Sequence, residues 1–269
     1  MSETSDAAAD PTIDSVIRVG VVGAGGRMGR TVCAAVAADP ALSLVGAVDP
    51  GAVGEHVEGL EIAGELRPLA EAGAQVVVDF TVADASRVTL PWLAMHGIHA
   101  VVGTTGFHDA DLATFRQAFV ASNCLIASNF AISAVLMMRF AELAAPWFET
   151  AEIIELHHDG KIDAPSGTAV TTAERMAAAS TGWAPDPTKH EVIAGARGGH
   201  GPGGIHIHSL RMRGMVAHQE VILGALGQTL TIRQDSYDRS SYMPGVVLAC
   251  KGIAGHPGLT LGLDTFLGV

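Results

Sequence analysis

Two histidines and a lysine lie within five consecutive positions of the sequence, at His157, His158 and Lys161. A histidine titrates near neutral pH and can donate or relay a proton, while a lysine can supply a cation or a second proton. A lone histidine or lysine is usually a solvated loop residue. Three of them in so short a segment predict a proton-handling site, all the more because 13 of the 16 basic residues are arginines.

A helix start follows this segment and predicts an anion site. A helix is expected over 167–180, and Ser166 directly before it can cap the first turn. The N–H groups and hydroxyls of Ser166, Gly167 and Thr168 then gather at the positive end of the helix dipole. Acid–base residues beside an anion site suit a small substrate that carries carboxylate groups.

The two histidines are expected to have different tasks. Residues 152–157 are typical of a strand, in which neighbouring side chains point to opposite sides. His157 and His158 should therefore face different ways unless the strand bends.

A glycine-rich turn lies near the amino terminus, between a predicted strand over 16–22 and a predicted helix over 28–38. Gly23, Gly26 and Gly29 follow a G-x-x-G-x-x-G spacing, which departs from the strict G-x-G-x-x-G fingerprint. Glycines here allow a tight turn and let backbone N–H groups approach a pyrophosphate, which the helix N-terminus also attracts. A tight turn with no ligand is the alternative, but the strand before it and the helix after it favour a dinucleotide site.

An acidic residue ends the next predicted strand, as a dinucleotide site requires. Asp49 follows residues 42–48 and lies 26 residues after Gly23, where a carboxylate can hold the hydroxyls of the adenosine ribose. Pro50 comes next, so no arginine stands there to receive a 2′-phosphate, which the carboxylate would repel. The local chemistry favours NADH, and Arg27 in the glycine turn leaves the use of both NADH and NADPH open.

Three further segments, 78–81, 102–106 and 127–130, each lie at the carboxyl end of a predicted strand. In an open parallel sheet that edge is where ligands bind. Their small and hydroxyl side chains suit a nicotinamide ribose or carboxamide. Plain turn chemistry would explain any one of the segments, whereas their shared position favours a common cofactor edge.

The elements that position these residues fall into two groups. In the first part, short apolar and β-branched runs alternate with longer amphipathic runs, which predicts a parallel sheet covered by helices on both faces. The predicted strands are 16–22, 42–48, 76–80, 98–102 and 125–128, and the predicted helices are 28–38, 85–96, 107–121 and 133–146.

The regular alternation of strands and helices then ends, and a second part begins with the strand over 152–157 and the helix over 167–180. A glycine-rich loop is expected over 195–204 and a final helix over 244–253. Three alternating runs are typical of antiparallel strands, namely 205–212, 217–223 and 228–234. The predicted fold class is α/β. A Rossmann-like dinucleotide-binding domain would span 16–131, completed by 241–269, and an α+β substrate domain with an open mixed sheet would span 132–240.

The composition is that of a globular chain with ample apolar material. Of the 269 residues 48% are hydrophobic and 16% are charged, and no apolar run approaches the roughly 18 residues needed to cross a bilayer. The formal net charge of −12 disfavours nucleic acid and anionic membranes as partners. Local clusters of basic groups can still bind an anionic cofactor.

Residues 1–15 are small and acidic and have neither the basic nor the apolar region of a signal peptide, so a disordered tail is expected there. Three cysteines, Cys33, Cys124 and Cys250, lie far apart and form no CxxC pair. Their odd number and apolar surroundings predict buried thiols in a reducing compartment. The expected location is the cytoplasm.

A second pair of histidines, His206 and His208, shares one face of a predicted strand and could chelate a metal. No cysteine and no third ligand at a suitable spacing accompanies them. An exposed or interfacial strand face is the preferred interpretation, and no metal site is predicted.

These motifs together resemble the dihydrodipicolinate reductase family, the 4-hydroxy-tetrahydrodipicolinate reductases of bacterial lysine and diaminopimelate synthesis. The resemblance runs in order along most of the chain. The matching segments are Gly23–Arg30, Asp79-Phe80-Thr81, Gly103–Phe107, Asn129-Phe130 and the string from His157 to Ala169. The string His-His…Lys…Asp-Ala-Pro-Ser-Gly-Thr is highly specific, whereas the glycine turn alone would not be.

The resemblance implies a reaction and a set of roles. Hydride would pass from NADH or NADPH to an unsaturated cyclic dicarboxylate, the dihydrodipicolinate-type intermediate. The catalytic residues would be His157, as proton donor and acceptor, and Lys161, as a second proton donor. The substrate carboxylates would be held by His158, Ser166, Gly167 and Thr168. The implied cofactor contacts are Gly23, Ala24, Gly25, Gly26, Arg27, Met28, Asp49, Gly103, Thr104, Thr105, Ala127, Ser128, Asn129 and Phe130.

The family also implies a homotetramer that forms through the sheet of the substrate domain. Many members carry an arginine directly after the acid equivalent to Asp49, where this chain has Pro50. A strong preference for NADPH is therefore not expected.

Two other functions compete with this reading. Another two-domain dehydrogenase, of the aspartate-semialdehyde or homoserine type, would share the glycine turn. The former needs a nucleophilic cysteine, and Cys124 within an apolar strand is a poor candidate. A catalytically silent NAD-binding sensor would be favoured by the loss of His157 or Lys161, and both are present.

Overall fold

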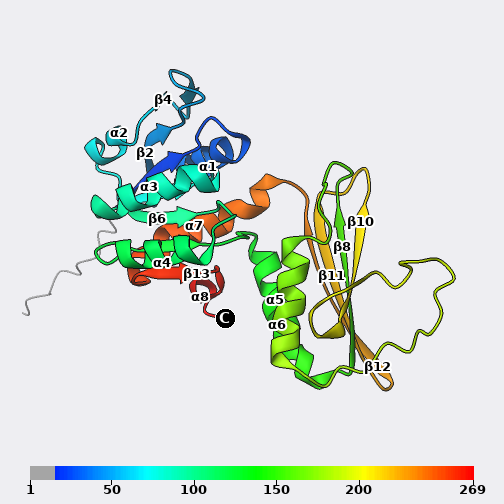
Figure 1. Cartoon of the computed structure of the whole chain (residues 1–269). Helices are drawn as coiled ribbons and strands as arrows, with labels where there is room; N and C mark the ends of the chain where they lie inside the picture. The colour runs from blue at the N-terminus through cyan, green and yellow to red at the C-terminus, as the bar shows by residue number, and fades with distance from the viewer. Residues whose placement is uncertain (1–15) are drawn as a thin grey trace, which may run out of the picture.

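The computed structural model describes residues 16–269, so the tail expected over 1–15 lies outside the described residues. The described chain forms one sheet of eight strands and one of five, each packed against helices (Figure 1). This arrangement confirms the predicted fold class, a Rossmann-like sheet joined to a second, mixed sheet.

The first sheet has the strand order β13-β7-β6-β5-β1-β2-β4-β3 and is parallel, except that β3 pairs with β4 in the antiparallel sense. Its strands are β1 (Ile17–Val22), β2 (Leu42–Val48), β3 (His56–Val57), β4 (Leu60–Ala63), β5 (Val76–Asp79), β6 (His99–Val102), β7 (Cys124–Ile126) and β13 (Leu259–Leu261). The helices around it are α1 (Arg27–Ala38), α2 (Arg67–Glu71), α3 (Ala83–Met95), α4 (Asp109–Ala118), α7 (Met243–Gly252), the 3-10 helix η4 (Ile253–Gly255) and α8 (Asp264–Leu267).

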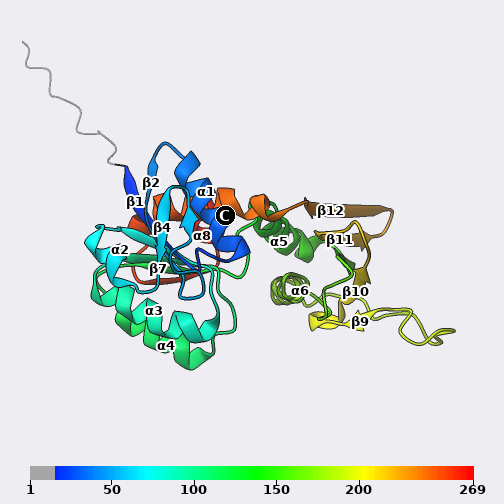
Figure 2. The same ribbon diagram turned by 90° about the horizontal axis from the view of Figure 1, so that it is seen from above.

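The alternation of side chains along the strands explains why helices cover both faces of this sheet. In β5, Val76 and Val78 belong to one buried cluster, which includes residues of α1 and α7. Val77 between them belongs to a second cluster, which includes residues of α3 and α4. Figure 2 shows the two pairs of helices on opposite sides of the sheet. Burial of each such valine contributes about 1.5–3 kcal/mol to stability.

The strand order places β1 between β2 and β5, so the winding of the chain reverses beside β1. In open α/β sheets, ligands bind at such a switch point, outside the carboxyl ends of the strands. The glycine-rich turn follows β1 at this edge and leads directly into α1.

The second sheet has the strand order β12-β11-β8-β10-β9. Its strands are β8 (Thr150–His157), β9 (Gly199–His200), β10 (His206–Arg211), β11 (Ala217–Ala225) and β12 (Gln228–Ser236). Helices α5 (Ile132–Ala144) and α6 (Gly167–Ala179) lie side by side on one face of it (Figures 1 and 2). The 3-10 helices here are η1 (Ala145–Trp147), η2 (Pro202–Gly204) and η3 (Arg239–Tyr242).

The sheet is mixed, as expected, but one of the three runs that resembled antiparallel strands has a parallel neighbour. β10 runs parallel to β8, with Leu210 opposite Leu156, and only β11 is antiparallel to both β8 and β12. The chain between β8 and β10 passes through α6 and a long loop, and a crossover of this kind returns the chain to the same end of the sheet. The segment over 195–204 is also not wholly a loop, because it contains β9, which pairs with β10.

The carboxyl-terminal segment returns to the first sheet. β13 extends that sheet in parallel with β7, and α7 packs near α1. Arg175 on α6 donates two hydrogen bonds to the carboxylate of Asp264 on α8, with Nη1–Oδ1 at 2.5 Å and Nη2–Oδ2 at 3.0 Å. This ion pair ties the helices of the second sheet to the end of the chain.

Of the exposed or interfacial strand face expected for His206 and His208, the exposed alternative is wrong for His206. Its side chain is buried under the loop over 181–198, and Nδ1 lies 2.6 Å from the carbonyl oxygen of Arg197. His208 lies on the same strand, and its Nε2 lies 2.7 Å from Oε2 of Glu152. Folding of this loop over the strand therefore buries the ring.

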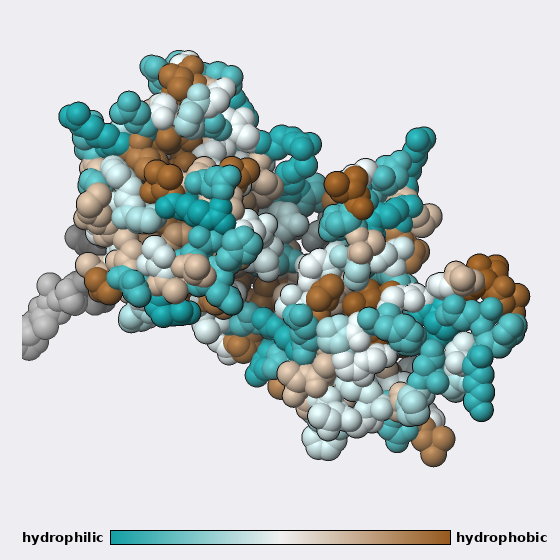
Figure 3. All heavy atoms as spheres, viewed as in Figure 1, coloured by the Kyte–Doolittle hydropathy of each residue, from teal (hydrophilic) through white to brown (hydrophobic). Residues whose placement is uncertain are grey.

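Hydrophobic side chains gather at the tip of the loop over 181–198, where Val192 and Ile193 are exposed (Figure 3). Within residues 16–269, no helix is both long and apolar enough to cross a membrane. The same residues contain no group of three or more histidine, cysteine or acidic side chains placed to hold a metal ion.

Candidate active site

A cavity of about 750 Å³ lies where the carboxyl edge of the first sheet faces the end of β8. The first sheet and its turns contribute Met28, Phe80, Gly103, Ala127, Ser128 and Phe130. The second part of the chain contributes His157, His158, Gly160, Lys161, Ile162, Asp163, Val216, Ala217, Ser236, Tyr237, Asp238, Arg239 and Tyr242. A cavity of this size accommodates a small ligand, and both halves of the fold contact it.

The glycine turn packs too tightly for larger residues at two positions. Gly23 has a φ of 81°, which side chains rarely adopt, and a Cβ on Gly29 would lie 2.0 Å from the carbonyl oxygen of Gly23. As a result the first turn of α1 packs directly on the glycine turn. Gly26 is the N-cap, and no side chain caps the first N–H groups. A helix start of this form fits a pyrophosphate, whose charge the helix dipole stabilises.

Asp49 lies beside this turn. Its carboxylate accepts hydrogen bonds from the N–H of Gly25, with N–Oδ2 at 3.0 Å, and from the N–H of Gly51, with N–Oδ1 at 2.9 Å. These bonds hold the acid at the start of α1, away from the cavity lining.

Asp79, at the end of β5, is fully buried and organises the neighbouring turns. Its Oδ1 accepts hydrogen bonds from the N–H and hydroxyl of Thr81, at 2.9 and 2.7 Å, and from the hydroxyl of Thr104, at 3.0 Å. Its Oδ2 accepts one from the hydroxyl of Ser86, at 2.9 Å. Burial raises the pKa of the Asp79 carboxyl even though these hydrogen bonds act to lower it.

The placement of Thr104 differs from what the sequence suggested. Its hydroxyl points inward to Asp79, so only its backbone is left to contact a cofactor, whereas Thr105 beside it is exposed. Gly103 packs under the ring of Phe80, since a Cβ there would lie 2.0 Å from a ring carbon. The turn after β6 is therefore shaped by the buried carboxylate below it and the aromatic ring beside it.

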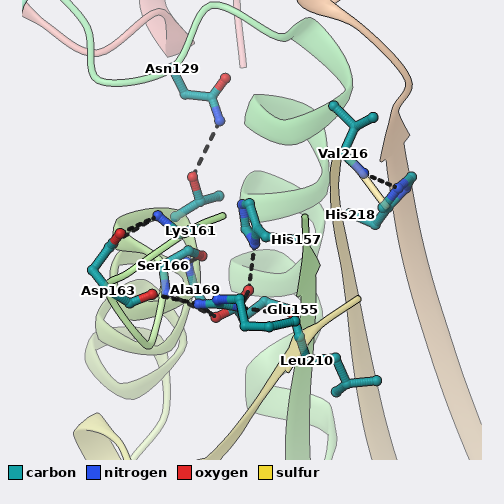
Figure 4. A network of polar contacts seen from close by, with 12 residues as sticks. Asn129, Glu155, His157, Lys161, Asp163, Ser166, Ala169, Leu210, Val216 and His218 are labelled. Carbon is teal, nitrogen blue, oxygen red and sulfur yellow. Dashed lines mark hydrogen bonds and ion pairs between the residues drawn. The ribbon is translucent and has the colours of Figure 1, made fainter. Parts of the chain in front are cut away.

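A hydrogen bond joins the cofactor edge to the second part of the chain. The amide nitrogen of Asn129, which is labelled in Figure 4, donates to the hydroxyl of Thr168 at 3.3 Å. The carbonyl oxygen of the same amide accepts from the N–H of Ala131 at 2.9 Å, which fixes its orientation. Phe130 between them is buried, and its ring centroid lies 5.7 Å from that of Phe80.

His157 is the last residue of β8 and is held by a buried carboxylate on its own strand. Its Nδ1 lies 2.5 Å from Oε2 of Glu155, which is fully buried (Figure 4). Arg211 on β10 donates from both terminal nitrogens to the same carboxylate, with Nη1–Oε2 and Nη2–Oε1 each at 2.9 Å. The Nδ1 edge of the imidazole is thus engaged, and the Nε2 edge is left for the cavity that the residue lines.

The pKa values of this pair shift for identifiable reasons. Burial lowers the pKa of His157, and the hydrogen bond and charge of Glu155 oppose that shift without reversing it. Burial would raise the pKa of Glu155, but hydrogen bonds from Arg211, Ser209 and His157 outweigh it and hold that pKa below its ordinary value. Glu155 is therefore ionised at neutral pH.

Lys161 lies in the loop after β8 and is paired with Asp163. Its Nζ donates to Oδ1 at 2.8 Å and to Oδ2 at 2.7 Å of that carboxylate, and the hydrogen bond lowers the pKa of Asp163. Asp163 is exposed, so the ammonium can exchange this partner for a ligand carboxylate at little cost.

The predicted opposition of the two histidines is not found, because both line the cavity. β8 ends at His157, so His158 belongs to the following loop and the alternation of a strand does not apply to it. The predicted cap is confirmed, since the hydroxyl of Ser166 accepts a hydrogen bond from the N–H of Ala169 at 3.3 Å. The N–H of Ser166 donates to Oε1 of Glu155 at 3.2 Å.

The cavity separates the predicted site residues into two sets. Those that line it are Met28, Gly103, Ala127, Ser128, Phe130, His157, His158 and Lys161. Those outside its lining are Gly23, Ala24, Gly25, Gly26, Arg27, Asp49, Thr104, Thr105, Asn129, Ser166, Gly167 and Thr168.

Residues 216–217, 236–239 and 242 also line the cavity, and sequence reasoning missed them. The segment 236–242 carries the chain from β12 back to α7. A connection between two sheets must pass along their boundary, so a return of the chain at this point was the available signal. Residues 216–217 belong to the cavity lining because β11 lies beside β8, with Ala217 opposite His157.

The comparisons with known proteins match both halves of the chain. The family model described as "Dihydrodipicolinate reductase, N-terminus" matches residues 17–130, and the one described as "Dihydrodipicolinate reductase, C-terminus" matches residues 133–267. The chain belongs to the dihydrodipicolinate reductase family. It is thus an NAD(P)H-dependent oxidoreductase of lysine and diaminopimelate biosynthesis.

Relatives within the family cover nearly the whole chain. A protein of Nocardia farcinica named 4-hydroxy-tetrahydrodipicolinate reductase is 52% identical over 258 residues, which is 93% of this chain and 98% of that relative. The solved structure of a dipicolinate-bound dihydrodipicolinate reductase from Paenisporosarcina sp. TG-14 is 35% identical, covers 93% of this chain and 99% of its own, and has a TM-score of 0.84.

An aspartate semialdehyde dehydrogenase from Vibrio cholerae shares the fold alone, with 11% identity, 89% of this chain and 99% of that chain covered, and a TM-score of 0.53. Its kind of chemistry would need a reactive cysteine. Cys33, Cys124 and Cys250 are all free and buried, as predicted. Burial raises the pKa of the Cys124 thiol far above its ordinary value, so no thiolate nucleophile is available there.

Proposed function

We propose that this reductase acts on a cyclic dicarboxylate, the dihydrodipicolinate-type intermediate formed from 4-hydroxy-tetrahydrodipicolinate, and converts it to tetrahydrodipicolinate. The observation that carries the proposal is the shared cavity. It brings His157, His158 and Lys161 to the carboxyl edge of the nucleotide-binding sheet. The dipicolinate bound in the solved relative supports a ligand with two carboxylates.

A nicotinamide dinucleotide fits the first sheet. The close packing of the glycine turn leaves room for a pyrophosphate at the start of α1, and Asp49 beside it suits the hydroxyls of a ribose. The remaining proposed contacts are those expected from the sequence, at 103–105 and 127–130, with Thr104 acting through its backbone. A bound reduced nicotinamide supplies the hydride.

The chain's own residues would bind the substrate and move the proton. His157 donates a proton from Nε2 as the ring is reduced, and Lys161 supplies a second proton or a cation. His158 and the first turn of α6, Gly167 and Thr168, hold the carboxylates. Ser166 contributes by capping that turn, because its hydroxyl and N–H are both engaged within the protein.

The cofactor preference follows from Asp49. A carboxylate engaged at the ribose position repels a 2′-phosphate, and Pro50 offers no cation to offset it. We infer that NADH is preferred or that both dinucleotides are used, since Arg27 is an exposed cation beside the turn.

The domain boundaries, assembly and location complete the proposal. A dinucleotide-binding domain spans 16–131 and 241–269, and a substrate domain spans 132–240. The family resemblance supports a homotetramer formed through the second sheet, in the cytoplasm. No nucleic acid or membrane partner is proposed, because the net charge of −12 disfavours both.

The decisive test couples a dihydrodipicolinate synthase to this protein and follows the nicotinamide absorbance. His157→Ala and Lys161→Ala should each lower kcat by about 100-fold or more. His190→Ala and Lys189→Ala serve as matched controls, because both residues are exposed in the loop over 181–198. Failure to oxidise either dinucleotide would contradict the reaction, and unchanged turnover in both site variants would contradict the roles.

The cofactor preference has its own test. Affinities for NADH and NADPH are measured by fluorescence titration in the wild type and in Asp49→Asn. The variant removes the repelling charge, so NADPH should gain affinity relative to NADH. A large NADPH preference in the wild type would refute the argument from Asp49.

A further inference from the structure

Glu155 connects three elements that surround His157. It is fully buried, and its two oxygens accept four hydrogen bonds that the structure resolves. The donors are Nδ1 of His157, both terminal nitrogens of Arg211, and the N–H of Ser166. One carboxylate therefore contacts the end of β8, the neighbouring strand β10 and the residue that caps α6.

We propose that Glu155 and Arg211 are positioning residues of the reaction: the ionised carboxylate accepts the Nδ1–H of His157, so that the transferable proton is carried on Nε2 toward the cavity. The inference rests on the proposed role of His157 as proton donor. Neither Glu155 nor Arg211 lines the cavity, so both act through other residues.

The tautomer follows from the donor inventory. An ionised carboxylate only accepts hydrogen bonds, so the ring nitrogen that faces it must carry a hydrogen. Glu155 is ionised because Arg211 pairs with it at two points, a geometry that favours the charged form. When His157 is also protonated at Nε2, the resulting imidazolium lies beside a negative charge that stabilises it.

Arg211 also fixes the loop that carries Lys161. Its Nη2 donates to the carbonyl oxygen of Asp163 at 2.6 Å, in addition to its bonds with Glu155. Asp163 in turn holds the ammonium of Lys161. The Glu155–Arg211 pair thus sets the relative positions of the two proton-handling groups and, through Ser166, of the helix start that would bind carboxylates.

Three charged groups face the imidazole of His157 from the elements around it. Glu155 on its own strand favours the protonated ring, whereas Lys161 in the following loop and Arg211 on β10 disfavour it. The hydrogen bond and charge of Glu155 exceed the effects of the two cations. Removal of the Glu155 charge should therefore lower the affinity of His157 for its proton, even if Arg211 is neutralised at the same time.

The test follows the protonation of His157 directly, by NMR of protein labelled at histidine nitrogens, with the signal assigned by its loss in His157→Gln. In Glu155→Gln the titration of His157 should move down by about one pH unit, which is a tenfold smaller imidazolium fraction above the midpoint. The kcat/KM profile should lose activity at a correspondingly lower pH, and kcat should fall more than KM changes.

Glu155→Gln leaves Arg211 without its counter-ion, which destabilises the fold, so the double variant Glu155→Gln/Arg211→Gln is measured beside it. The double variant replaces the ion pair by two amides and should keep the lowered titration. Arg213→Ala is the matched control, because this arginine is exposed and pairs with the exposed Asp159. In this variant the titration midpoint of His157 should equal that of the wild type.

Two results would overturn the proposal. One is an unchanged His157 titration in both Glu155 variants. The other is a loss of kcat that is equally large in a His157→Gln background, since a residue that acts through His157 has no further effect once the ring is gone. The NMR titration needs no turnover, so it remains decisive even if the proposed reaction itself is not observed.

Discussion

Two buried carboxylates, Asp79 and Glu155, each lie near the carboxyl end of a strand and accept four hydrogen bonds. Around Asp79 every donor is a hydroxyl or a backbone N–H, and burial raises its pKa. Around Glu155 the donors include a guanidinium and an imidazole, and its pKa is lowered.

The difference shows that a buried carboxylate can have two different effects on its surroundings. The neutral donors around Asp79 order the turns of the cofactor edge through hydrogen bonds alone. The cation beside Glu155 keeps that carboxylate ionised, so it can act electrostatically on a titrating ring. A buried acid therefore organises a backbone in either case, but it tunes a proton donor only where a cation is paired with it.

The largest expected contrast is in stability. Glu155→Ala leaves Arg211 as a mostly buried, unpaired charge and should cost about 3–5 kcal/mol. Asp79→Ala leaves only neutral donors unpaired and should cost about 1–3 kcal/mol. Urea denaturation of both variants measures the two values, with Arg213→Ala as the surface control. Equal losses of unfolding free energy in the two variants would contradict the distinction between the two sites.

Replacing each acid by its amide should also destabilise the protein by different amounts at the two sites. In Asp79→Asn the carbonyl oxygen can take the place of Oδ1, and the hydroxyl of Ser86 can turn to accept from the new amide. The change should cost less than about 1 kcal/mol. Glu155→Gln should cost clearly more, because Arg211 loses its counter-ion. Thermal unfolding of the pair tests this order, and a tolerated Glu155→Gln beside a damaging Asp79→Asn would reverse it.

A smaller effect is expected within the cofactor edge itself. Thr104→Val removes the hydroxyl that donates to Asp79 and accepts from the N–H of Thr81, at a cost of about 1 kcal/mol. Thr105→Val, one position along and exposed, should leave stability unchanged. Thermal unfolding combined with dinucleotide titration distinguishes the two, and similar losses would show that the inward hydroxyl has no special role.

The subtlest contrast is the sign of the pH dependence. Asp79 has a folded pKa above its ordinary value of 3.8, so its contribution to stability falls as pH rises from 3.8 toward the raised pKa. Glu155 has a folded pKa below its ordinary value of 4.5, so its contribution is present above 4.5 and is lost as pH falls toward the lowered pKa.

Denaturation curves across the acid range, each compared with the matching amide variant, measure these slopes. Relative to Asp79→Asn, the wild type should lose stability with rising pH. Relative to Glu155→Gln, the wild type should gain it. Slopes of the same sign would contradict the assignment of charge at one of the two acids.

Local sequence patterns were sufficient to predict several of the helices and strands and part of the candidate site. The β-branched runs and the glycine turn predict β1, α1 and β2 closely, because period and turn chemistry depend on near neighbours in the chain. The proximity of His157 to Lys161 and the capping role of Ser166 are also local. The short elements β3, β4, α2 and β13 have too few residues to show a period and were missed.

Only the tertiary structure decided what depends on distant residues. The sequence by itself determined the chemical inventory of the site, since His157, Lys161 and the helix start lie within one segment. It did not reveal that Arg211 pairs with Glu155, that Thr104 turns inward to Asp79, or that β10 runs parallel to β8. Each of these joins residues far apart along the chain, and burial and pairing between such residues arise only when the strands take their places in the sheets.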